Sequence, residues 1–234
     1  MKVEIKHRFS GAILFALETE SMRLCVEAAV QSRVSLDYAS LVGARLDGAS
    51  LVEASLDGAS LDGARLDGAS LVGARLDGAS LVGARLDGAS LVEASLDGAS
   101  LDGARLDGAS LVGASLDGAS LVGARLVGAS LVGASLVGAS LDGPRGEKLT
   151  LVGLRPVLQL GPLGSRCAYL QVWLTDAGVY VRAGCFWDRL DAFRAAVTST
   201  HGDGIHAQEY AAAIALIEAH ARLWTPEAAA KVAV

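Results

Sequence analysis

Ala64-Arg65-Leu66-Asp67-Gly68 and Ala79-Ser80-Leu81-Val82-Gly83 are two copies of a five-residue unit that repeats from Ser35 to Gly143. Leu stands at every fifth position from Leu36 to Leu141, twenty-two times without interruption. A short fixed period over such a length is typical of a solenoid, in which each unit buries its apolar face against its neighbours. The repeat therefore decides the architecture of this part of the chain.

The period of five excludes the common alternatives to a β solenoid. A helix needs apolar residues at a spacing of about 3.6, and a Gly in every turn would weaken it by ~1 kcal/mol each. Collagen needs Gly at every third position together with much Pro. Five residues instead suit a short extended segment and a tight turn, in which Gly supplies a positive φ. Ala and Leu, two positions apart, then point inward, and the Ser/Arg and Asp/Val positions face outward.

These units resemble the pentapeptide-repeat proteins. The resemblance implies a mainly β fold, a right-handed quadrilateral parallel β-helix with four pentapeptides per coil, and about five and a half coils rising ~4.8 Å each. The sequence departs from the family at one position. The family carries Asp or Asn just before the central Leu, where this chain has Ser or Arg, and here Asp follows the Leu. Hydrogen bonding at the corners can therefore differ from the family pattern.

Every twentieth residue should lie on the same side of the rod, so the outward positions sort into four faces. We call them the acidic face, the alternating face, the Arg/Asp face and the Val face. The acidic face carries Asp37, Asp57, Asp77, Asp97 and Asp117, with Arg75 as its single cation. The alternating face carries Val42, Asp62, Val82, Asp102, Val122 and Asp142. The Arg/Asp face carries Arg45, Arg65, Arg85, Arg105 and Arg125 beside Asp47, Asp67, Asp87 and Asp107. The Val face carries Val52, Val72, Val92, Val112 and Val132.

Each face has a structural and a functional interpretation. The Arg/Asp face reads as a self-neutralising lattice of exposed ion pairs, each worth ~0–1 kcal/mol. The acidic face is an uncompensated column of carboxylates, which is either an ordinary solvated surface or a docking surface for a basic partner. The Val face is either favourable β stacking or an apolar interface. The last complete coil has Val on all four faces, and we expect this collar to be covered by the C-terminal segment or by a second copy; it consists of Val122, Val127, Val132 and Val137.

Charge and composition narrow the range of partners. The chain has 234 residues and a formal net charge of −6. Twelve Asp and two Glu against six Arg give residues 35–143 a net charge of −8, so the flanks sum to +2. Direct nucleic-acid binding is therefore not expected, because phosphates would be repelled. No apolar run is long enough for a membrane span, and no signal peptide is seen, so we expect a cytoplasmic protein. The expected state of Cys25, Cys167 and Cys185 is buried free thiols.

The flanks of the repeat predict two further parts. Residues 1–34 predict a β-hairpin over residues 2–18, with a turn at Ser10-Gly11, and a helix over residues 21–31 that caps the first coil. Residues 144–234 predict an α+β module, because Pro144 interrupts the repeat. Its expected strands are residues 157–160, 168–175 and 178–186. Asp188 is expected to cap one helix, whose core-facing residues are expected to be Leu190, Phe193 and Val197. Asp203 is expected to cap a longer helix, whose core-facing residues are expected to be Ile205, Ala212, Leu216 and Leu223.

One cluster could carry chemistry. His201, Asp203, His206 and Glu209 fall near a helix start, where such residues can bind metal, but the favoured interpretation is a polar interhelical loop with an Asp N-cap. The sequence has no paired nucleophile and base and no phosphate-binding Gly loop. We therefore expect no active site, metal or cofactor.

Two functions follow, with an enzyme as a distant third. The favoured function is a non-catalytic structural or protein-interaction module that binds a protein partner or forms a homodimer, like bacterial or phage pentapeptide-repeat proteins with an α+β module. The alternative is implied by the resemblance to quinolone-resistance members, whose acidic rods mimic DNA and bind gyrase, a type II topoisomerase. Here the charge density is about one per 3 Å, against one per ~1.7 Å in duplex DNA. A metal-dependent enzyme would rest on His201 and His206 alone.

Overall fold

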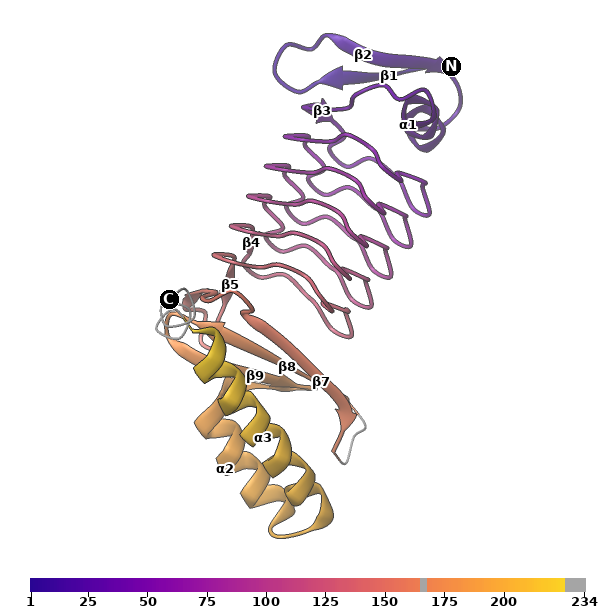
Figure 1. Ribbon diagram of the computed structural model, residues 1–234. Coiled ribbons are helices and arrows are strands. Elements are labelled where there is room, and N and C mark those ends of the chain that lie inside the picture. The colour runs from indigo at the N-terminus through magenta and orange to yellow at the C-terminus, as the bar shows by residue number, and fades with distance from the viewer. Residues whose placement is uncertain (165–167, 226–234) are drawn as a thin grey trace. The chain divides into compact units, whose positions relative to one another are not determined.

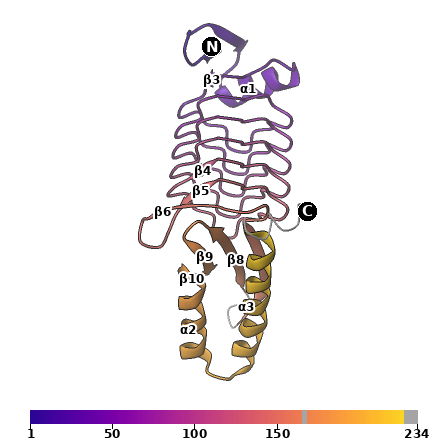
Figure 2. The same cartoon turned by 60° about the vertical axis from the view of Figure 1, so that its left-hand side comes forward.

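The computed structural model describes residues 1–164 and 168–225 of the chain. The chain divides into two compact units, Met1–Ser135 and Leu136–Val234. In the first unit, the outward Ser and Arg residues from Ser40 to Ser115 form parallel bridges to the residues twenty positions later, as in the series Ser40, Ser60, Ser80, Ser100 and Ser120. Four such series run along the unit, so a coil holds twenty residues and the prediction of a β-helix solenoid is confirmed (Figures 1 and 2).

The interior of the coils is filled by Leu and Ala, as the repeat predicts. Leu46, Leu66 and Leu86 are fully buried, and the Ala residues of these coils are nearly so. Burying one Leu side chain contributes about 1.5–3 kcal/mol, so the Leu columns supply the main apolar stabilisation of the unit. The coils also contain two short strands, β3 (Ala39–Ser40) and β4 (Ser120–Leu121).

The turn between successive repeats has a positive φ at its last position. Gly occupies this position in most repeats, for example Gly88 with φ +67°. Tyr38, Glu53 and Glu93 stand in place of Gly and keep the same left-handed conformation, with φ between 56° and 57°. A side chain in this region costs roughly 1–2 kcal/mol. These three repeats therefore hold strained turns that the rest of the coil imposes.

The N-terminal segment contacts the first coils. β1 (Lys2–His7) and β2 (Ile13–Glu18) form the antiparallel hairpin expected from the sequence, and β1 also pairs with β3. Helix α1 (Met22–Gln31) begins at Ser21, whose hydroxyl accepts the N–H of Leu24 at 3.2 Å. Its buried residues include Cys25, as predicted.

Side chains of α1 and the hairpin bind backbone groups of the first coils. The Glu27 carboxylate accepts the N–H of Ser50 at 3.0 Å, and Arg23 donates to the carbonyl of Asp47 at 3.1 Å. Arg8 donates to the carbonyl of Gly58 at 2.8 Å. The backbone at this end of the solenoid is thus hydrogen-bonded where no preceding coil exists.

The second unit contains a β-hairpin and a four-stranded antiparallel sheet. β5 (Ser140–Asp142) pairs with β6 (Lys148–Thr150) around Pro144. The sheet has the order β10-β9-β8-β7. Its strands are β7 (Val157–Leu163), β8 (Ala168–Thr175), β9 (Gly178–Ala183) and β10 (Phe186–Arg189). Three strands were expected; the third expected strand is in fact two, because the chain turns at Gly184, φ +60°, and returns as β10.

Two helices cover one face of this sheet, as the shared apolar core shows. α2 (Leu190–His201) and α3 (Ile205–Trp224) contribute Phe193, Val197 and Ile217 to a core with Leu170 and Val172 of β8. No helix in the described part of the chain combines the length and apolarity that crossing a membrane requires.

Both expected helix caps in this unit are wrong. Asp188 continues β10, opposite Val181, and its carboxylate accepts the N–H of Arg189 at 2.8 Å, so α2 begins without a side-chain cap. Gly204 is the N-cap of α3, also without a side-chain hydrogen bond, and Asp203 lies one residue too early. Strand pairing and the turn at Gly202 set these helix starts in place of capping chemistry.

The expected core face of α3 is also wrong. Ile205, Leu216 and Leu223 are 78%, 51% and 60% exposed, and Ala212 is exposed as well. The buried face instead consists of Tyr210, Ala213, Ile214 and Ile217. Apolar residues occur around most of α3, so periodicity alone could not select the face that packs on the sheet.

We predict that Glu93→Gly stabilises the protein. Gly removes the strain of the left-handed turn, and the free energy of unfolding should rise by about 0.5–1 kcal/mol. Part of the gain is offset because Glu93 Cγ packs over Gly113. The measurement is the midpoint of denaturant unfolding.

Gly88→Ala is the matched control, because an added Cβ there meets nothing within 4 Å but keeps φ at +67°. It should lower stability by about 1 kcal/mol through strain alone. Destabilisation by Glu93→Gly of the same size would contradict the argument.

Candidate functional site

In most repeats of the first unit, one backbone N–H has no backbone acceptor among the described residues. Around one corner, the N–H groups of Ser60, Leu41, Gly43 and Ala44 all donate to backbone carbonyls at 2.7–3.0 Å. The fifth N–H belongs to the outward Asp/Val position. It needs a side chain or water as its acceptor, because a buried unpaired N–H costs about 1–3 kcal/mol.

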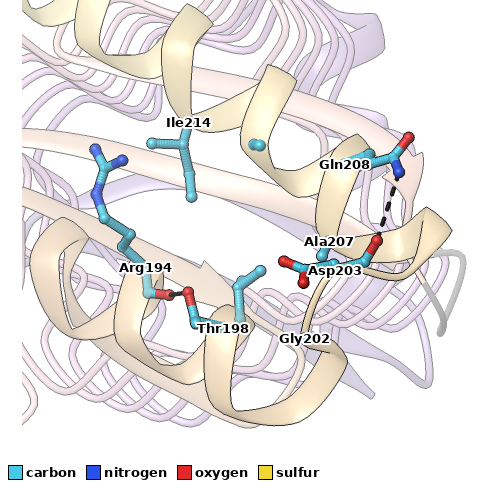
Figure 3. A pocket seen from close by; sticks show the side chains of 9 residues that line it. Arg194, Thr198, Gly202, Asp203, Ala207, Gln208 and Ile214 are labelled. Atoms are coloured by element: carbon cyan, nitrogen blue, oxygen red, sulfur yellow. Dashed lines mark hydrogen bonds between the residues drawn. The ribbon is translucent and has the colours of Figure 1, made fainter.

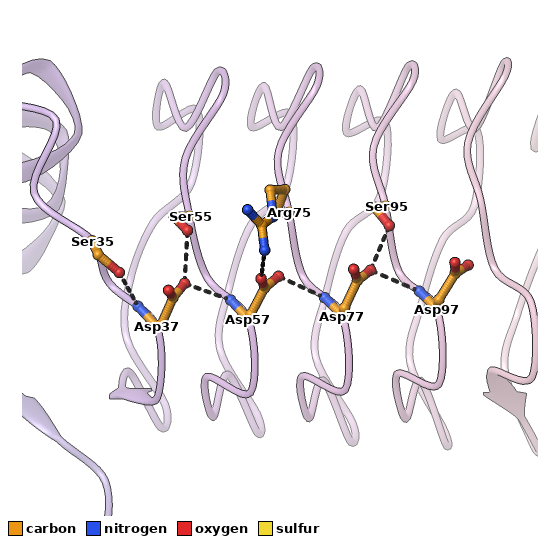
Figure 4. Close-up of polar contacts among 8 residues, drawn as sticks. All are labelled: Ser35, Asp37, Ser55, Asp57, Arg75, Asp77, Ser95 and Asp97. Carbon is orange, nitrogen blue, oxygen red and sulfur yellow. Dashed lines mark hydrogen bonds and ion pairs between the residues drawn. The ribbon is translucent and has the colours of Figure 1, made fainter.

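On the acidic face, the carboxylates supply this acceptor. Asp37 Oδ1 accepts the N–H of Asp57 at 3.0 Å and the Ser55 hydroxyl at 2.8 Å (Figure 4). The same backbone bond joins Asp57 to Asp77 and Asp77 to Asp97, both at 3.1 Å, and Asp97 to Asp117 at 2.9 Å. Hydroxyls of Ser95, Ser115 and Ser135 bond Asp77, Asp97 and Asp117 in turn, and Arg75 bonds Asp57.

The acidic face has Arg75 as its cation, as the sequence indicates, but its carboxylates are hydrogen-bonded and not simply solvated. Four of its five Asp residues are half-buried, Asp97 being the exposed member, and each accepts hydrogen bonds from the following coil. Charge-assisted bonds of this kind are about twice as strong as neutral ones. The observed role of these carboxylates is to link successive coils. That the acidic face also binds a basic partner stays a prediction.

The pKa of Asp37 shows the balance of these effects. Burial acts to raise it, but hydrogen bonds from Ser55, Ser35 and the N–H of Asp57, together with the charge of Arg75, leave the pKa below its ordinary value. A carboxylate with a lowered pKa stabilises the folded state while it is ionised. The link that Asp37 makes between the first coil and the second is therefore strongest at pH values above the pKa of Asp37.

The Arg/Asp face is a lattice of ion pairs between successive coils, as predicted. Arg65, Arg85, Arg105 and Arg125 bind the Asp eighteen residues earlier, with N–O distances of 3.1, 2.7, 2.6 and 2.6 Å. The Arg side chains are 42–58% exposed, so each pair contributes only ~0–1 kcal/mol. The face is nearly neutral to an approaching molecule.

The Val face has no comparable internal role. Val52 and Val132 are 41% and 59% exposed, and Val72, Val92 and Val112 between them are half-buried. A Val side chain cannot accept the fifth N–H, and within the described residues the N–H groups of Val72, Val92 and Val112 have no acceptor. This face therefore combines apolar side chains with unpaired donors, which makes it a candidate surface for a partner.

The Val collar is only partly enclosed. Val127, Val132 and Val137 are 54%, 59% and 37% exposed, and Val122 is half-buried. Cover by the C-terminal segment stays a prediction for these side chains. Cover by a second copy stays a prediction.

The structure also brings together exposed aromatic residues that the sequence reasoning missed. The rings of His7 and Phe9 lie 5.7 and 6.2 Å from that of Tyr38, and Arg8 lies over the Phe9 ring at 5.0 Å. Phe9 is 74% exposed. The one sequence signal was Tyr38 itself, which stands where the repeat has Gly.

The His cluster forms contacts within unit two. His201 stacks on Tyr210 with 5.6 Å between ring centroids, and His206 Nδ1 lies 3.8 Å from Glu209 Oε2. The same Glu209 oxygen accepts the N–H of Gly164 at 2.9 Å, which ties α3 to the end of β7. In the part of the chain that the structure describes, no group of three His, Cys, Asp or Glu could hold a metal ion. This geometry supports the interpretation as a structural loop.

A cavity of about 450 Å³ lies between α2 and α3 (Figure 3). Val197, Ala207, Ala211 and Ile214 form its apolar lining, and Arg194, Thr198, Asp203 and Gln208 line its polar part. The Thr198 hydroxyl donates to the carbonyl of Arg194 at 3.1 Å. Arg194 also pairs with Glu218 at 2.5 Å, so its charge is neutralised within the helical pair.

The cysteines differ from the expectation of three buried thiols. Cys25 is fully buried, and its Sγ donates to the carbonyl of Val3 at 3.5 Å. Burial raises the pKa of this thiol, although a backbone hydrogen bond from Leu17 opposes the shift. Cys185 is exposed, because it lies in the turn between β9 and β10. Cys167 lies outside the described residues.

The family of pentapeptide repeats matches the chain in eight copies, over residues 32–68, 69–111 and 109–143. Among solved structures, a pentapeptide repeat protein from the thylakoid lumen of Arabidopsis thaliana is 31% identical, covering 44% of this chain and 65% of its own, with a TM-score of 0.28. One from Nostoc PCC 7120 is 34% identical, covering 42% and 69%, with a TM-score of 0.15. Full-length QnrB1, a plasmid-mediated fluoroquinolone resistance protein, is 21% identical, covering 44% and 61%, with a TM-score of 0.24.

The chain thus spans about two thirds of the length of these structures, 61–69%. No curated protein matches the chain.

We predict that Asp77→Val destabilises the solenoid by about 1–3 kcal/mol, because it removes the acceptor of a backbone N–H and of a hydroxyl. These donors are Asp97 N, at 3.1 Å from Asp77 Oδ1, and the Ser95 hydroxyl. Val is compatible with the position, since it stands at equivalent places in other repeats. The shift in unfolding midpoint measures the effect.

Asp47→Val is the control for this substitution. Asp47 occupies the same place in its repeat, but the contact of its side chain within the described residues is the exposed ion pair with Arg65. The expected loss is therefore ~0–1 kcal/mol. Equal losses in the two variants would show that the backbone bond contributes nothing.

We also predict a loss of stability in acid that depends on Asp37. Its folded pKa lies below the ordinary 3.8, so its contribution is present above that pH and disappears as the pH falls through the lowered value. Asp37→Asn should flatten the dependence of the unfolding midpoint on pH across this window. An unchanged dependence in the variant would mean that Asp37 is not coupled to folding.

Proposed function

Because the chain belongs to the pentapeptide-repeat family, we propose that it is a non-catalytic structural and protein-interaction module that binds a protein partner or a second copy of itself. One observation carries the proposal: the charged outward side chains are largely used between coils, whereas the Val face has no such use. A contiguous exposed apolar surface marks a candidate interaction site, and a solenoid presents such a surface on a rigid scaffold.

In this proposal the parts of the chain have separate roles. Residues 1–34 cap the rod, residues 35–143 form a right-handed quadrilateral β-helix of about five and a half coils, and residues 144–234 form a separate α+β module. The partner contacts the Val face at Val52, Val72, Val92, Val112 and Val132.

DNA mimicry receives less support from the geometry. Carboxylates of the acidic face are half-buried and hydrogen-bonded, and those of the Arg/Asp face are paired with Arg. A DNA mimic needs accessible, dense negative charge. In a gyrase supercoiling assay we therefore expect no effect of the protein, and inhibition at stoichiometric amounts would favour the mimic over the proposal.

Photo-crosslinking from the Val face tests the proposal. A photoreactive benzoyl-phenylalanine at Val92 should give a crosslinked protein adduct in extract of the source cells, and mass spectrometry should identify the partner. The matched control is the same residue at Arg45, which is exposed on the Arg/Asp face. Adducts from Arg45 that equal those from Val92, or none from Val92, would contradict binding through the Val face.

A further inference from the structure

The outer edge of the N-terminal sheet is open. The strand order is β2-β1-β3, so β1 is paired on both sides and β2 on one side only (Figure 1). Strand β2 reads Ile-Leu-Phe-Ala-Leu-Glu over Ile13–Glu18. An exposed edge strand offers a row of unpaired N–H and C=O groups that can pair with another chain.

The register shows which backbone groups of β2 face outward. The N–H of Thr19 donates to the carbonyl of Met1 at 2.9 Å, and Leu17 lies opposite Val3. Since hydrogen-bonded and non-bonded pairs alternate along an antiparallel ladder, Thr19, Leu17 and Phe15 bond to β1. The N–H and C=O groups of Ala16 and Glu18 therefore point away from β1, to the free edge.

This edge lacks the features that normally prevent pairing. Its interior contains no charged residue, Pro or Gly, and Glu18 is the one charged residue, at its end. The edge strands of the second sheet differ: β7 contains Gly161 and Pro162, and β10 is four residues long and ends in Asp188-Arg189. Short, charged or Pro-containing edges are the usual protection, so β2 differs from both edges of the second sheet.

Side chains along β2 are also only partly covered. Phe15 and Leu17 lie opposite Ile5 and Val3, which are buried at 0% and 9% exposure. Phe15 and Leu17 themselves are half-buried, because nothing in the described residues extends the sheet beyond them. A further strand at this edge would cover apolar surface on the core side of the sheet.

We propose that β2 pairs antiparallel with β2 of a second copy, about a two-fold axis at Leu17. In this register Ala16 lies opposite Glu18 of the second copy, and Glu18 lies opposite Ala16 of the second copy. Each of these two pairs exchanges two backbone hydrogen bonds, so the whole contact has about four. Leu17 lies against Leu17, and Phe15 against Thr19 of the second copy. The two sheets join into one, and the contact is isologous, as in most homodimers.

Charge supports a second copy as the occupant. Residues 1–34 carry five Lys or Arg and four Asp or Glu, so this end is close to neutral, whereas residues 35–143 carry a net −8. Like-charged rods repel through their acidic surface, and the hairpin is the part of unit one where two copies meet with little repulsion. This contact is separate from the Val face and does not depend on the proposed function.

Ala16→Pro tests the pairing. It removes an N–H that the hairpin does not use, and Pro is tolerated on an edge strand whose N–H faces solvent. Ala16→Ser is the matched control, because it keeps the N–H at similar size. By sedimentation equilibrium, the wild type and Ala16→Ser should dimerise with rising concentration, and Ala16→Pro should stay monomeric with an unchanged circular dichroism spectrum. A wild type that is monomeric at every concentration, or an Ala16→Pro dimer, overturns the proposal.

Amide hydrogen exchange of the wild type gives an answer even if Ala16→Pro fails to fold. The amides of Phe15 and Leu17 should be protected at all concentrations, because they bond to β1. Those of Ala16 and Glu18 should become protected only as the dimer forms. Fast exchange of Ala16 and Glu18 in a sample shown to be dimeric places the contact elsewhere and overturns the proposal.

Discussion

The whole solenoid depends on the parallel hydrogen bonds between residues twenty positions apart. Because the N–H of Leu41 donates to the carbonyl of Ser60, and this relation repeats coil after coil, every position of the repeat forms a column. Leu then lies on Leu inside the rod, and the turn residue lies on the turn residue at each corner. The coil is strong enough to hold Glu53 and Glu93 in left-handed turns where other repeats have Gly.

The same column geometry explains why acidic residues are frequent. In most repeats, one N–H has no backbone acceptor among the described residues, and an Asp one coil earlier can accept it while a Ser or Arg donates to the same carboxylate. The hydrogen bonds between coils therefore explain the frequent Asp at this position without any binding function. The family resemblance suggested corner bonding different from the usual pattern, and the position of Asp after the Leu is the reason that it contacts the next coil.

Surfaces without such an internal use are better candidates for function. The Val face combines half-exposed apolar side chains with N–H groups that have no acceptor among the described residues. The free edge of β2 has unpaired backbone and little charge. Both lie in the first unit and differ chemically: one is a side-chain surface and the other a backbone edge, so they can serve different partners at once.

The amino-acid sequence by itself determined the period, the buried Leu columns, the sorting of outward residues into faces and the N-terminal hairpin and helix. These follow from local rules, because a fixed repeat and a turn residue act within a few positions of each other. Only the tertiary structure decided that the acidic face is hydrogen-bonded between coils, since its partners lie eighteen and twenty residues away. It also decided which side of α3 is buried and where α2 and α3 begin. A helix with apolar residues around most of its circumference has no clear core face until a sheet packs against it. Strand pairing placed Asp188 in β10, where the local pattern predicted a helix cap.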